Sequence, residues 1–320
     1  MGVTGAEAEK FGKIAGNLYA GAYGESLEQV GDVVASLQRT VFEDVEAPEL
    51  EKLAGIALSM ETAFDGAATE YVQLAGQLQN QGVVKSVAEG LDFITKGFQQ
   101  LPKAIQGDLT EAVNEYGTFL TAIGFSTEET FGVLTQAAKG GKFELDKTGD
   151  ALKEFQIRAT DMSTASVDAF GKVGLDAQSM SNQILAGGDV ARGAFEEIVD
   201  GLLSITDPTE QANAAIALFG TPLEDLGVNE IPQFLEGLDS MGKGFEDVAG
   251  SAGLLDETVN DNLRTKLEAF KRRSLATLAT FMNRVVVPAV EGLAAAFTST
   301  LGPAIDFIQD QARRVGEIFR

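Results

Sequence analysis

The 320-residue sequence contains no histidine, no cysteine and no tryptophan. Without imidazole or thiol groups it cannot form a His or Cys metal site, a Ser-His-Asp or Cys-His nucleophile, a disulfide or a thiol redox centre. Carboxylates, hydroxyls and amines remain for any chemistry. The hydrophobic fraction of 44% and the charged fraction of 22% are those of an ordinary globular chain, so the sequence predicts one large or two medium hydrophobic cores.

Basic residues are outnumbered by acidic ones, 24 to 48, which gives a net charge of −24. The imbalance belongs to the first part of the chain, because residues 1–263 have a net charge of −28 and residues 264–320 a net charge of +4. Non-specific binding to DNA comes mainly from the neutralisation of phosphates by Lys and Arg. We therefore expect no specific nucleic-acid binding by the acidic part.

Long uncharged apolar runs are also lacking. A membrane-spanning helix needs about 18 or more such residues. The nearest candidate, residues 274–305, carries Arg284 and Glu291 and is interrupted by Pro288 and Pro303. An amphipathic packing helix explains this segment better than a membrane span does. The acidic, Gly-containing start of the sequence does not resemble a signal peptide, which predicts a protein made and kept in a cytoplasm.

Apolar residues recur with helical spacing wherever a pattern is clear. The clearest stripes, with apolar residues at i, i+3, i+4 and i+7, are Val30, Val33, Val34 and Leu37; Tyr71, Leu74, Ala75 and Leu78; and Phe195, Ile198, Val199 and Leu202. Long alternating runs of β-branched residues, which are typical of strands, are missing from the sequence. The pattern predicts an all-α fold.

Start and stop signals divide the chain into short helices. Ser126 with Glu129 forms a capping box. Asp207 precedes a proline at the first helical position, and the stretch Thr221–Glu224 combines both features, with Thr221 as the expected N-cap. Glycine makes up 36 residues, which is above the usual fraction of about 7%, and inside a helix it costs roughly 1 kcal/mol relative to alanine. We therefore expect short helices, punctuated by glycine and arranged as helical hairpins.

Gly-Asp pairs precede apolar stretches at Gly31-Asp32, Gly107-Asp108 and Gly149-Asp150. Their spacing predicts the starts of successive hairpins and a weak repeat of about 40 to 50 residues, because one hairpin cannot bury its apolar face alone. Acidic N-caps in a helical protein without a repeat explain these pairs equally well.

Composition divides the chain into four segments. We expect an N-terminal helical segment (1–47), a helical-hairpin region (48–240), a Gly-rich linker (241–262) and a basic, apolar segment (263–320). The last predicts a longer amphipathic helix, because its apolar residues share one face. The apolar face consists of Leu263, Leu267, Phe270, Leu278, Phe281 and Val285, and the basic cluster that crosses the helix is Lys271, Arg272 and Arg273.

Candidate sites for chemistry have little support in the sequence. Glu128-Glu129 and Glu224-Asp225 are adjacent pairs, whose side chains point in different directions on a helix and not at each other across a cleft. Asp146 and Asp150 lie four residues apart without the ligand loop of a calcium site. Gly-Gly pairs such as Gly140-Gly141 lack the Lys-Ser or Lys-Thr of a phosphate-binding loop. We predict no catalytic residue, no metal and no cofactor.

Two blocks of the sequence carry a recognisable pattern. One block, DPTEQANAAIALFGTPLEDL from Asp207 to Leu226, contains the signature LFGT followed by ED, and the other runs from Asn114 to Asp161. In this order and spacing they resemble the tail tape-measure proteins of long-tailed phages and prophages. The signature residues are Leu218, Phe219, Gly220, Thr221, Glu224 and Asp225 in the one block, and Glu115, Tyr116, Asp150, Glu154 and Phe155 in the other. We interpret Phe219 as a core aromatic rather than a contact anchor, and Gly220 as the end of one helix.

The resemblance implies a non-enzymatic structural protein of the virion tail. Such proteins occupy the lumen of the growing tail tube, set its length and leave ahead of the genome during ejection. The resemblance therefore implies a homo-oligomer whose partners are the tail tube protein, tail-assembly chaperones and tail tip proteins, with the host cytoplasm as the place of assembly. Transient contact with the host membrane is a further implication.

Two other functions stay open from the sequence. One is a helical-repeat scaffold for protein interactions. The other is a membrane-active ejection factor that uses residues 274–305, with Lys271, Arg272, Arg273 and Phe281 as contacts to a membrane or to the tube wall. A solvated charged helix face is the commoner explanation of the basic cluster.

Overall fold

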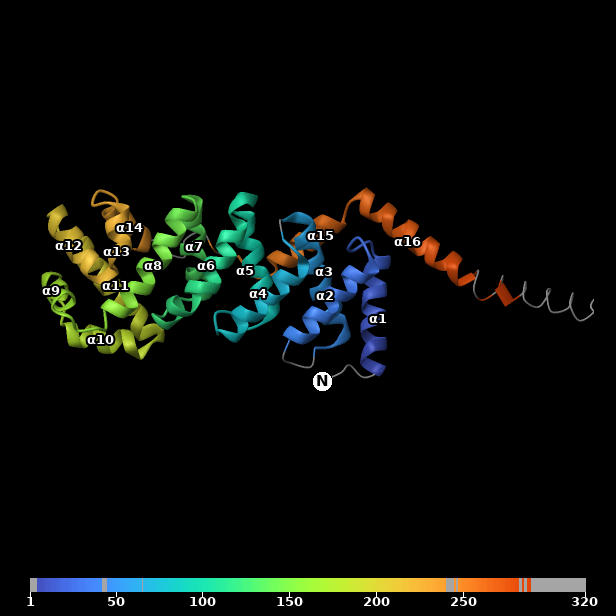
Figure 1. Cartoon of the computed structure of the whole chain (residues 1–320), viewed down its shortest axis with the longest axis horizontal. Helices are drawn as coiled ribbons and strands as arrows, with labels where there is room; N and C mark the ends of the chain where they lie inside the picture. Colours follow the sequence, from blue (N-terminus) through green and yellow to red (C-terminus); the bar gives the residue numbers. More distant parts are fainter. Residues whose placement is uncertain are drawn as a thin grey trace, which may run out of the picture. The chain divides into compact units, whose positions relative to one another are not determined.

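The computed structural model of the chain describes residues 5–41, 45–64, 66–239, 245, 247–281, 284, 287 and 288 (Figure 1). These residues contain sixteen α-helices and no β-strand, which confirms the predicted all-α fold. The helices are α1 (Gly5–Ala20), α2 (Leu27–Thr40), α3 (Ala47–Ala63), α4 (Ala68–Asn80), α5 (Val87–Gln99), α6 (Lys103–Ala122), α7 (Thr127–Lys139), α8 (Lys142–Arg158), α9 (Thr164–Lys172), α10 (Ala177–Ala186), α11 (Gly188–Leu203), α12 (Pro208–Phe219), α13 (Thr221–Leu226), α14 (Ile231–Asp239), α15 (Ser251–Asn260) and α16 (Leu263–Phe281).

The chain divides into two compact units by its internal contacts. Unit 1 consists of residues 1–19 and 23–262 and holds α2 to α15 with nearly all of α1. Unit 2 consists of residues 20–22 and 263–320 and holds α16.

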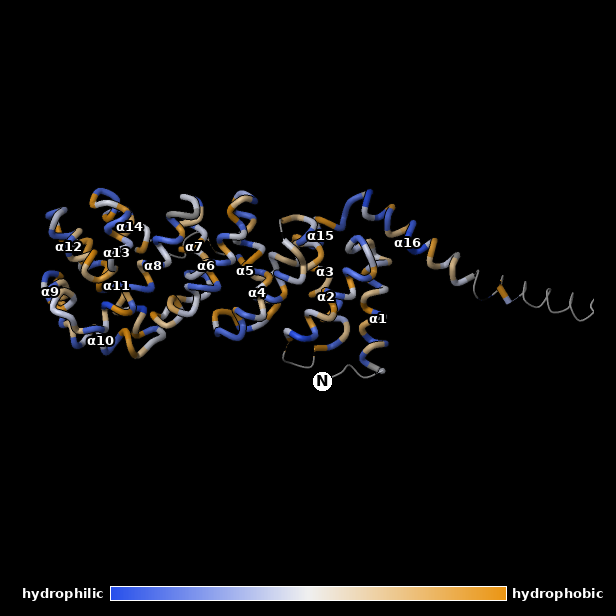
Figure 2. Tube along the Cα trace, in the orientation of Figure 1, coloured by the Kyte–Doolittle hydropathy of each residue, from blue (hydrophilic) through white to orange (hydrophobic). Residues whose placement is uncertain are grey.

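Helices of unit 1 pack both on their neighbours in the chain and on helices farther along it. The pairs α2 and α3, α4 and α5, α6 and α7, and α10 and α11 are in contact, as helices joined by short turns would be. Helix α8 packs on α6, α7, α12 and α13, which brings two distant stretches of the chain together. Figure 2 shows hydrophobic and hydrophilic residues interspersed along the helices, as expected of helices that have an apolar and a polar face.

Three helix starts show how the local sequence signals work. Ser126 forms the predicted capping box at the start of α7: its side chain accepts a hydrogen bond from the Glu129 backbone N–H, and its own backbone N–H donates to Glu129 Oε2. Asp207 caps α12 as predicted, accepting from the backbone N–H groups of Thr209 and Glu210. The start of α13 differs, because the N-cap is Gly220 and Thr221 is the first helical residue.

The Gly-Asp pairs do not precede helices, and that prediction is wrong. Gly31-Asp32 lies inside α2, Gly107-Asp108 inside α6 and Gly149-Asp150 inside α8. An aspartate within a helix cannot supply the N-cap, so the spacing of these pairs does not mark hairpin starts. The basis for the predicted 40- to 50-residue repeat is therefore removed.

The Gly-rich linker expected over residues 241–262 contains a packed helix. Helix α15 lies in its second half and contacts α3 and α5, far from it in sequence. Phe245 and Val248, just before α15, are buried. The expectation failed because Gly242, Gly244, Gly250 and Gly253 lie on either side of these apolar residues, so the stretch shows no helical stripe. Residues 240–244 and 246 lie outside the described residues.

Helix α16 forms over the segment where the sequence predicts a long amphipathic helix. Leu267 and Phe270, which belong to its expected apolar face, are 65% and 69% exposed in the chain. The side chains of Leu263, Leu278 and Phe281, with most of residues 282–320, lie outside the described part. In that described part no helix combines the length and the hydropathy needed to cross a membrane.

Candidate functional site

The signature residues of both blocks meet around α8. Glu115 and Tyr116 belong to α6, and the other residues of that block belong to α8. The residues of the LFGT and ED signature belong to α12 and α13, with Gly220 at the joint between these two helices. All four helices are in contact through α8. The residues of this signature junction are Glu115, Tyr116, Asp150, Glu154, Phe155, Leu218, Phe219, Gly220, Thr221, Glu224 and Asp225.

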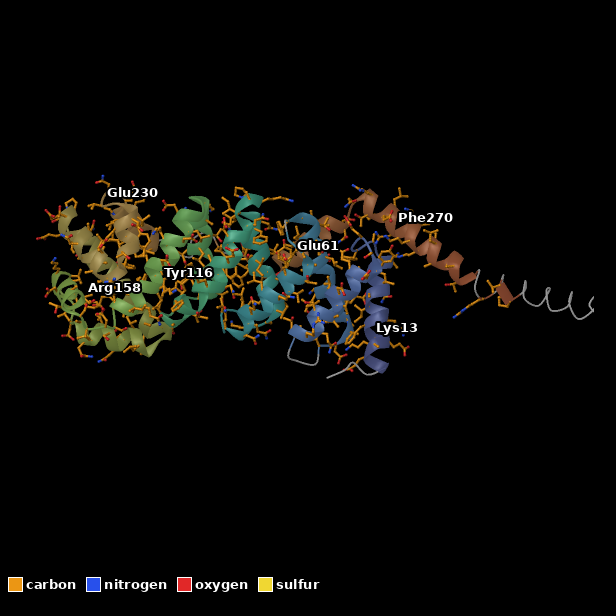
Figure 3. All side chains as sticks on the ribbon, in the orientation of Figure 1. Lys13, Glu61, Tyr116, Arg158, Glu230 and Phe270 are labelled. Atoms are coloured by element: carbon orange, nitrogen blue, oxygen red, sulfur yellow. The ribbon has the colours of Figure 1, made fainter. Side chains whose placement is uncertain are left out.

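Tyr116 joins α6 to α8 through two features of its ring. Its hydroxyl donates a hydrogen bond of 3.1 Å to Asp150 Oδ1, and its ring lies against Gly149, where any Cβ would overlap the ring. Burial, followed by the charge of Asp150, raises the pKa of the Tyr116 hydroxyl above its usual value, so the hydroxyl stays protonated and can donate. Tyr116 is buried, and Figure 3 shows its place between the helices of this region.

A cluster of phenylalanine rings forms the centre of the junction. The Phe155 and Phe219 ring centroids are 4.8 Å apart, and Phe155 meets Phe195 of α11 edge to face at 5.0 Å. Phe219 also meets Phe234 of α14 edge to face at 5.8 Å. Such pairs add to the free energy of burial itself. Phe155 and Phe219 are fully buried, so both belong to the core of unit 1.

Gly220 occupies a position that another residue would fill badly. It ends α12 and also caps the start of α13, with a φ of +79°. A Cβ on it would lie 2.8 Å from Arg158 Nε and 3.0 Å from Glu154 Cβ, both on α8. Arg158 Nε in turn donates a 2.9 Å hydrogen bond to Glu154 Oε2 (Arg158 is labelled in Figure 3). Gly220 is therefore required both by its backbone conformation and by the close approach of α8.

The polar residues of the junction form ion pairs near its surface. Lys147 of α8 pairs with Asp225 of α13, and Lys153 of α8 pairs with Glu115 of α6 at 3.8 Å. Thr221 and Glu224 are exposed. The polar contacts thus join α8 to α6 and α13, whereas the aromatic core joins α8 to α11 and α12 and extends through Phe219 to α14.

The contacts of the junction are those of packed helices. Asp150 and Glu154 accept hydrogen bonds from Tyr116 and Arg158, and Asp225 and Glu115 pair with lysines of α8. Within the described residues, no group of three or more acidic side chains is arranged to hold a metal ion. An open groove of about 1070 Å³ between α7, α8 and α14 includes none of the signature residues.

Comparison with known proteins decides the family. The sequence profile of phage-related minor tail proteins matches residues 2–220. The chain belongs to this family. The matched range includes α1 to α12 and ends at Gly220, in the middle of the signature junction. A phage-related minor tail protein has a structural role in the phage tail, in agreement with the structural role that the sequence resemblance implies.

A second comparison finds a relative with a more specific name. The probable tape measure protein of Streptomyces phage phiC31 is 29% identical over 219 residues. The aligned region covers 68% of this minor tail protein chain but 29% of the relative's own length. No solved structure is significantly similar to the chain.

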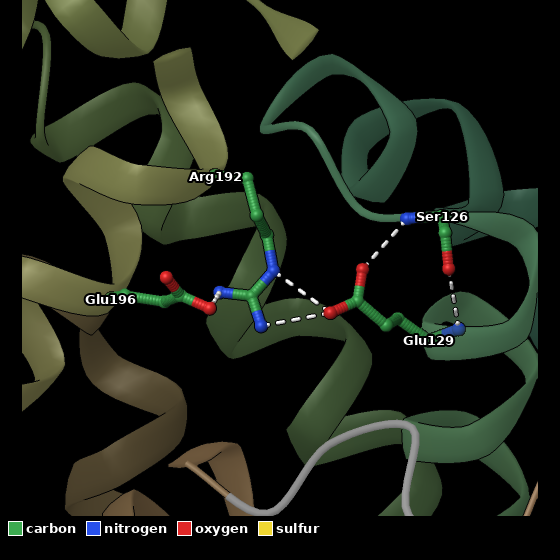
Figure 4. Close-up of polar contacts among 4 residues, drawn as sticks. All are labelled: Ser126, Glu129, Arg192 and Glu196. Atoms are coloured by element: carbon green, nitrogen blue, oxygen red, sulfur yellow. Dashed lines mark hydrogen bonds and ion pairs between the residues drawn. The ribbon is translucent and has the colours of Figure 1, made fainter. Parts of the chain in front are cut away.

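Sequence reasoning missed one polar contact of this minor tail protein, which Figure 4 shows. Arg192 of α11 donates to Glu129 Oε1 from both Nε (3.0 Å) and Nη2 (2.8 Å), and it pairs with Glu196 at 3.1 Å. The guanidinium also lies 5.1 Å from the centre of the Phe125 ring. Glu129 was identifiable as a capping residue from its spacing, but its second partner lies 63 positions away and leaves no local signal.

The predicted contact cluster on α16 is partly described. Lys271 and Arg272 pair with Glu268 of the same helix, at 3.6 Å and 3.1 Å, while Arg273 is exposed. Phe281 lies at the end of α16, and its side chain is outside the described part. Phe270 projects from the helix and is labelled in Figure 3. The described part of α16 therefore presents both apolar and basic side chains.

Proposed function

We propose that this chain is a segment of a tape-measure protein that lies in the lumen of the tail tube, helps to set tail length and is released during genome ejection. The 219-residue match to a probable tape measure protein is the observation that carries this proposal. The signature junction supports it, because the residues that resemble the tape-measure family pack against one another in unit 1. Tail tube protein, tail-assembly chaperones and tail tip proteins are the proposed partners of a homo-oligomer assembled in the host cytoplasm.

The helix lengths bear on how such a segment could measure length. No described helix exceeds the 20 residues of α6, which span roughly 30 Å at about 1.5 Å per residue. A continuous helix over all 320 residues would reach roughly 480 Å. The folded hairpins of unit 1 therefore contribute little length, and a ruler made from this segment has to extend.

The charge distribution supports a position in the path of DNA. With a net charge of −28, residues 1–263 repel phosphates, so an ejected genome would not adhere to them. Fluorescence anisotropy of labelled duplex DNA in low salt should show no binding to the full chain below about 100 μM, since non-specific binders reach about 1 to 100 μM at physiological salt. Micromolar affinity would contradict this part of the proposal.

An in-frame deletion of residues 103–203 from the phage gene tests the ruler function. It removes α6 to α11, which correspond to roughly 150 Å of continuous helix. Electron microscopy of the assembled tails should show a shortening of about that size. Tails of unchanged length with lost infectivity would assign the segment to ejection instead.

A point variant supplies the matched control. Phe219→Ala keeps the chain length but removes a ring from the centre of the signature junction. If the number of residues alone sets tail length, tails that assemble with this variant keep the wild-type length, although fewer tails assemble. Shortened tails in the Phe219→Ala phage would show that the fold, and not the number of residues, controls tail length.

A second candidate function is contact of α16 with a membrane or with the wall of the tube. The exposed Leu267 and Phe270 and the basic Lys271 and Arg273 are the observation that favours it, since amphipathic helices with basic faces bind anionic surfaces. Phe270→Glu should abolish dye leakage from vesicles of phosphatidylserine and phosphatidylcholine. Thr265→Glu, on the same helix but outside the apolar stripe, is the control, and equal leakage from both variants would reject the role of this face.

A further inference from the structure

Helix α15 is seated on the body of unit 1 by polar contacts. Asp92 of α5 accepts hydrogen bonds from the backbone N–H groups of Gly250 (2.8 Å) and Ala252 (2.9 Å), and so caps α15 from another helix. Gly250 is the N-cap residue of α15 and has no side chain, so Asp92 supplies the cap in its place.

The other end of α15 is held around Asp256. Its carboxylate accepts hydrogen bonds from Ser59 Oγ (2.6 Å), the Tyr23 hydroxyl (3.2 Å) and Asn260 Nδ2 (2.9 Å). Asn260 Nδ2 also donates to Ser59 Oγ at 2.9 Å. Ser59 lies on α3 and Tyr23 precedes α2, so this group joins α15 to two other parts of unit 1.

The apolar contribution of α15 is small. Ala252 is its one buried hydrophobic residue, Leu255 is partly buried against the core, and Leu254 is 65% exposed. By contrast, the segment before α15 has a strong apolar anchor, because Phe245 stacks on Phe93 of α5 at 6.0 Å and on Phe131 of α7 at 5.9 Å. Elements with few buried apolar contacts open at a lower free energy than the core does.

Gly250 lies between the buried Phe245 and the polar contacts that hold α15. Gly250 has a φ of +81°, and no atom lies within 4 Å of the place of its absent Cβ. The backbone can therefore rotate there without moving the buried Phe245. With α15 in place, its last residue, Asn260, is held beside Ser59 of α3, and with α15 released the chain would separate from the other helices of unit 1 at Gly250.

We propose that α15 is a releasable clasp, which turns on Gly250, is retained by Asp92 and by the hydrogen bonds around Asp256, and opens without unfolding the rest of unit 1. Opening frees the ten residues of α15 and exposes the face of α3 and α5 that they cover. The use of this opening to extend the segment inside a tail tube rests on the proposed function. The clasp itself does not, because it is a property of the isolated chain.

The cysteine-free sequence allows a direct test. A single Ala252→Cys substitution places the sole thiol of the full 320-residue chain in the buried face of α15, and Ala151→Cys places one in the core helix α8. With a thiol reagent under native conditions, Ala252→Cys should be labelled at least about 10-fold faster than Ala151→Cys. Equal labelling rates would overturn the proposal, because α15 would then open only when the whole unit unfolds.

A second substitution identifies the retaining group. Asp92→Ala in the Ala252→Cys background should raise the labelling rate about fivefold, which is the usual effect of losing one helix cap. Asp176→Ala, which removes the cap of α10 from within its own helix, is the matched control and should leave this rate unchanged.

Hydrogen exchange of residues 251–260 in the unsubstituted chain gives an independent measurement of the opening of α15. Exchange of these amides at the rate of α8 would reject the clasp, and faster exchange would support it.

Discussion

The guanidinium of Arg192 and the carboxylate of Glu129 form a two-donor contact, in which Nε and Nη2 of the arginine both reach Oε1 of the glutamate. The other oxygen of Glu129 accepts from the backbone N–H of Ser126 and completes the cap of α7. One carboxylate therefore fixes the start of α7 and attaches it to α11. The side chains of Arg192 and Glu129 are only 16% and 22% exposed, so water competes weakly for either group.

Removal of this carboxylate should be costly. Glu129→Ala is expected to lower the free energy of unfolding by about 2 kcal/mol, since it removes a cap and leaves a half-buried guanidinium with one partner fewer. Urea denaturation followed by circular dichroism measures the change. Glu128→Ala, which alters an exposed carboxylate in the same turn, should change the value by less than about 0.5 kcal/mol. Similar losses in both variants would mean that Arg192 contributes nothing.

Substitution of the two glycines that flank α13 distinguishes the cost of backbone strain from the cost of steric overlap. Gly227 has a φ of +84° and open space around its absent Cβ, so Gly227→Ala should cost about 1 kcal/mol from backbone conformation alone. Gly220→Ala adds the displacement of Arg158 and Glu154, and should cost about 1 to 2 kcal/mol more. Thermal unfolding of the two variants side by side gives the difference. Equal melting temperatures would show that α8 yields freely to the added methyl group.

The aromatic centre of the signature junction should dominate the stability of unit 1. Phe219→Ala is expected to lower the free energy of unfolding by about 3 to 5 kcal/mol, because it leaves a cavity among Phe155, Phe195 and Phe234. Ile157→Ala, at a half-exposed position of α8, should cost less than about 1 kcal/mol. A loss at Phe219 as small as that at Ile157 would contradict the packing described for the junction. Chemical denaturation provides both values.

The contribution of Asp256 to the stability of the folded state should depend on pH. Burial raises the pKa of its carboxyl, in spite of the hydrogen bonds from Ser59, Tyr23 and Asn260 that favour the charged form, and the charge of Glu257 adds to the rise. The folded state therefore binds the proton more tightly than the unfolded state. The contribution of this group to stability is complete below the usual pKa of an aspartate, about 3.9, and is lost as the pH rises through the folded value.

Measurement of the free energy of unfolding from about pH 3.5 to pH 7 tests this dependence. Asp256→Asn removes the titration, so the difference in stability between wild type and variant should change in favour of the variant as the pH rises. Asp261→Asn, at the nearby exposed end of α15, serves as the control. A difference between wild type and Asp256→Asn that stays constant over this range would show that Asp256 has an ordinary pKa.

Local signals predicted the fold where a single helix contains the whole signal. The stripe from Val30 to Leu37 and the capping box of Ser126 and Glu129 depend on residues within one or two turns, and both predictions hold. The Gly-Asp pairs misled because a pair of residues cannot show whether it precedes a helix or lies within it. At Gly149 the structure gives the reason for the glycine, which is the ring of Tyr116 and not a helix end.

Contacts between distant residues could not be read from the sequence. Asp92 and Gly250 are 158 positions apart, and Ser59 and Asp256 are 197 apart. The sequence around each of these residues contains no pattern that marks its distant partner. The resemblance to a known family identified the residues of the signature junction, and only the three-dimensional arrangement shows that they meet at α8.

The double role of Gly220 limits how this part of the chain can change in length. Because the residue that ends α12 also starts α13, no spacer exists in which an inserted or deleted residue could be absorbed. One added residue would rotate α13 by roughly 100° about its axis and carry Asp225 away from Lys147. Insertions in related proteins should therefore fall in longer turns, such as residues 81–86, while the joint between α12 and α13 keeps an invariant register.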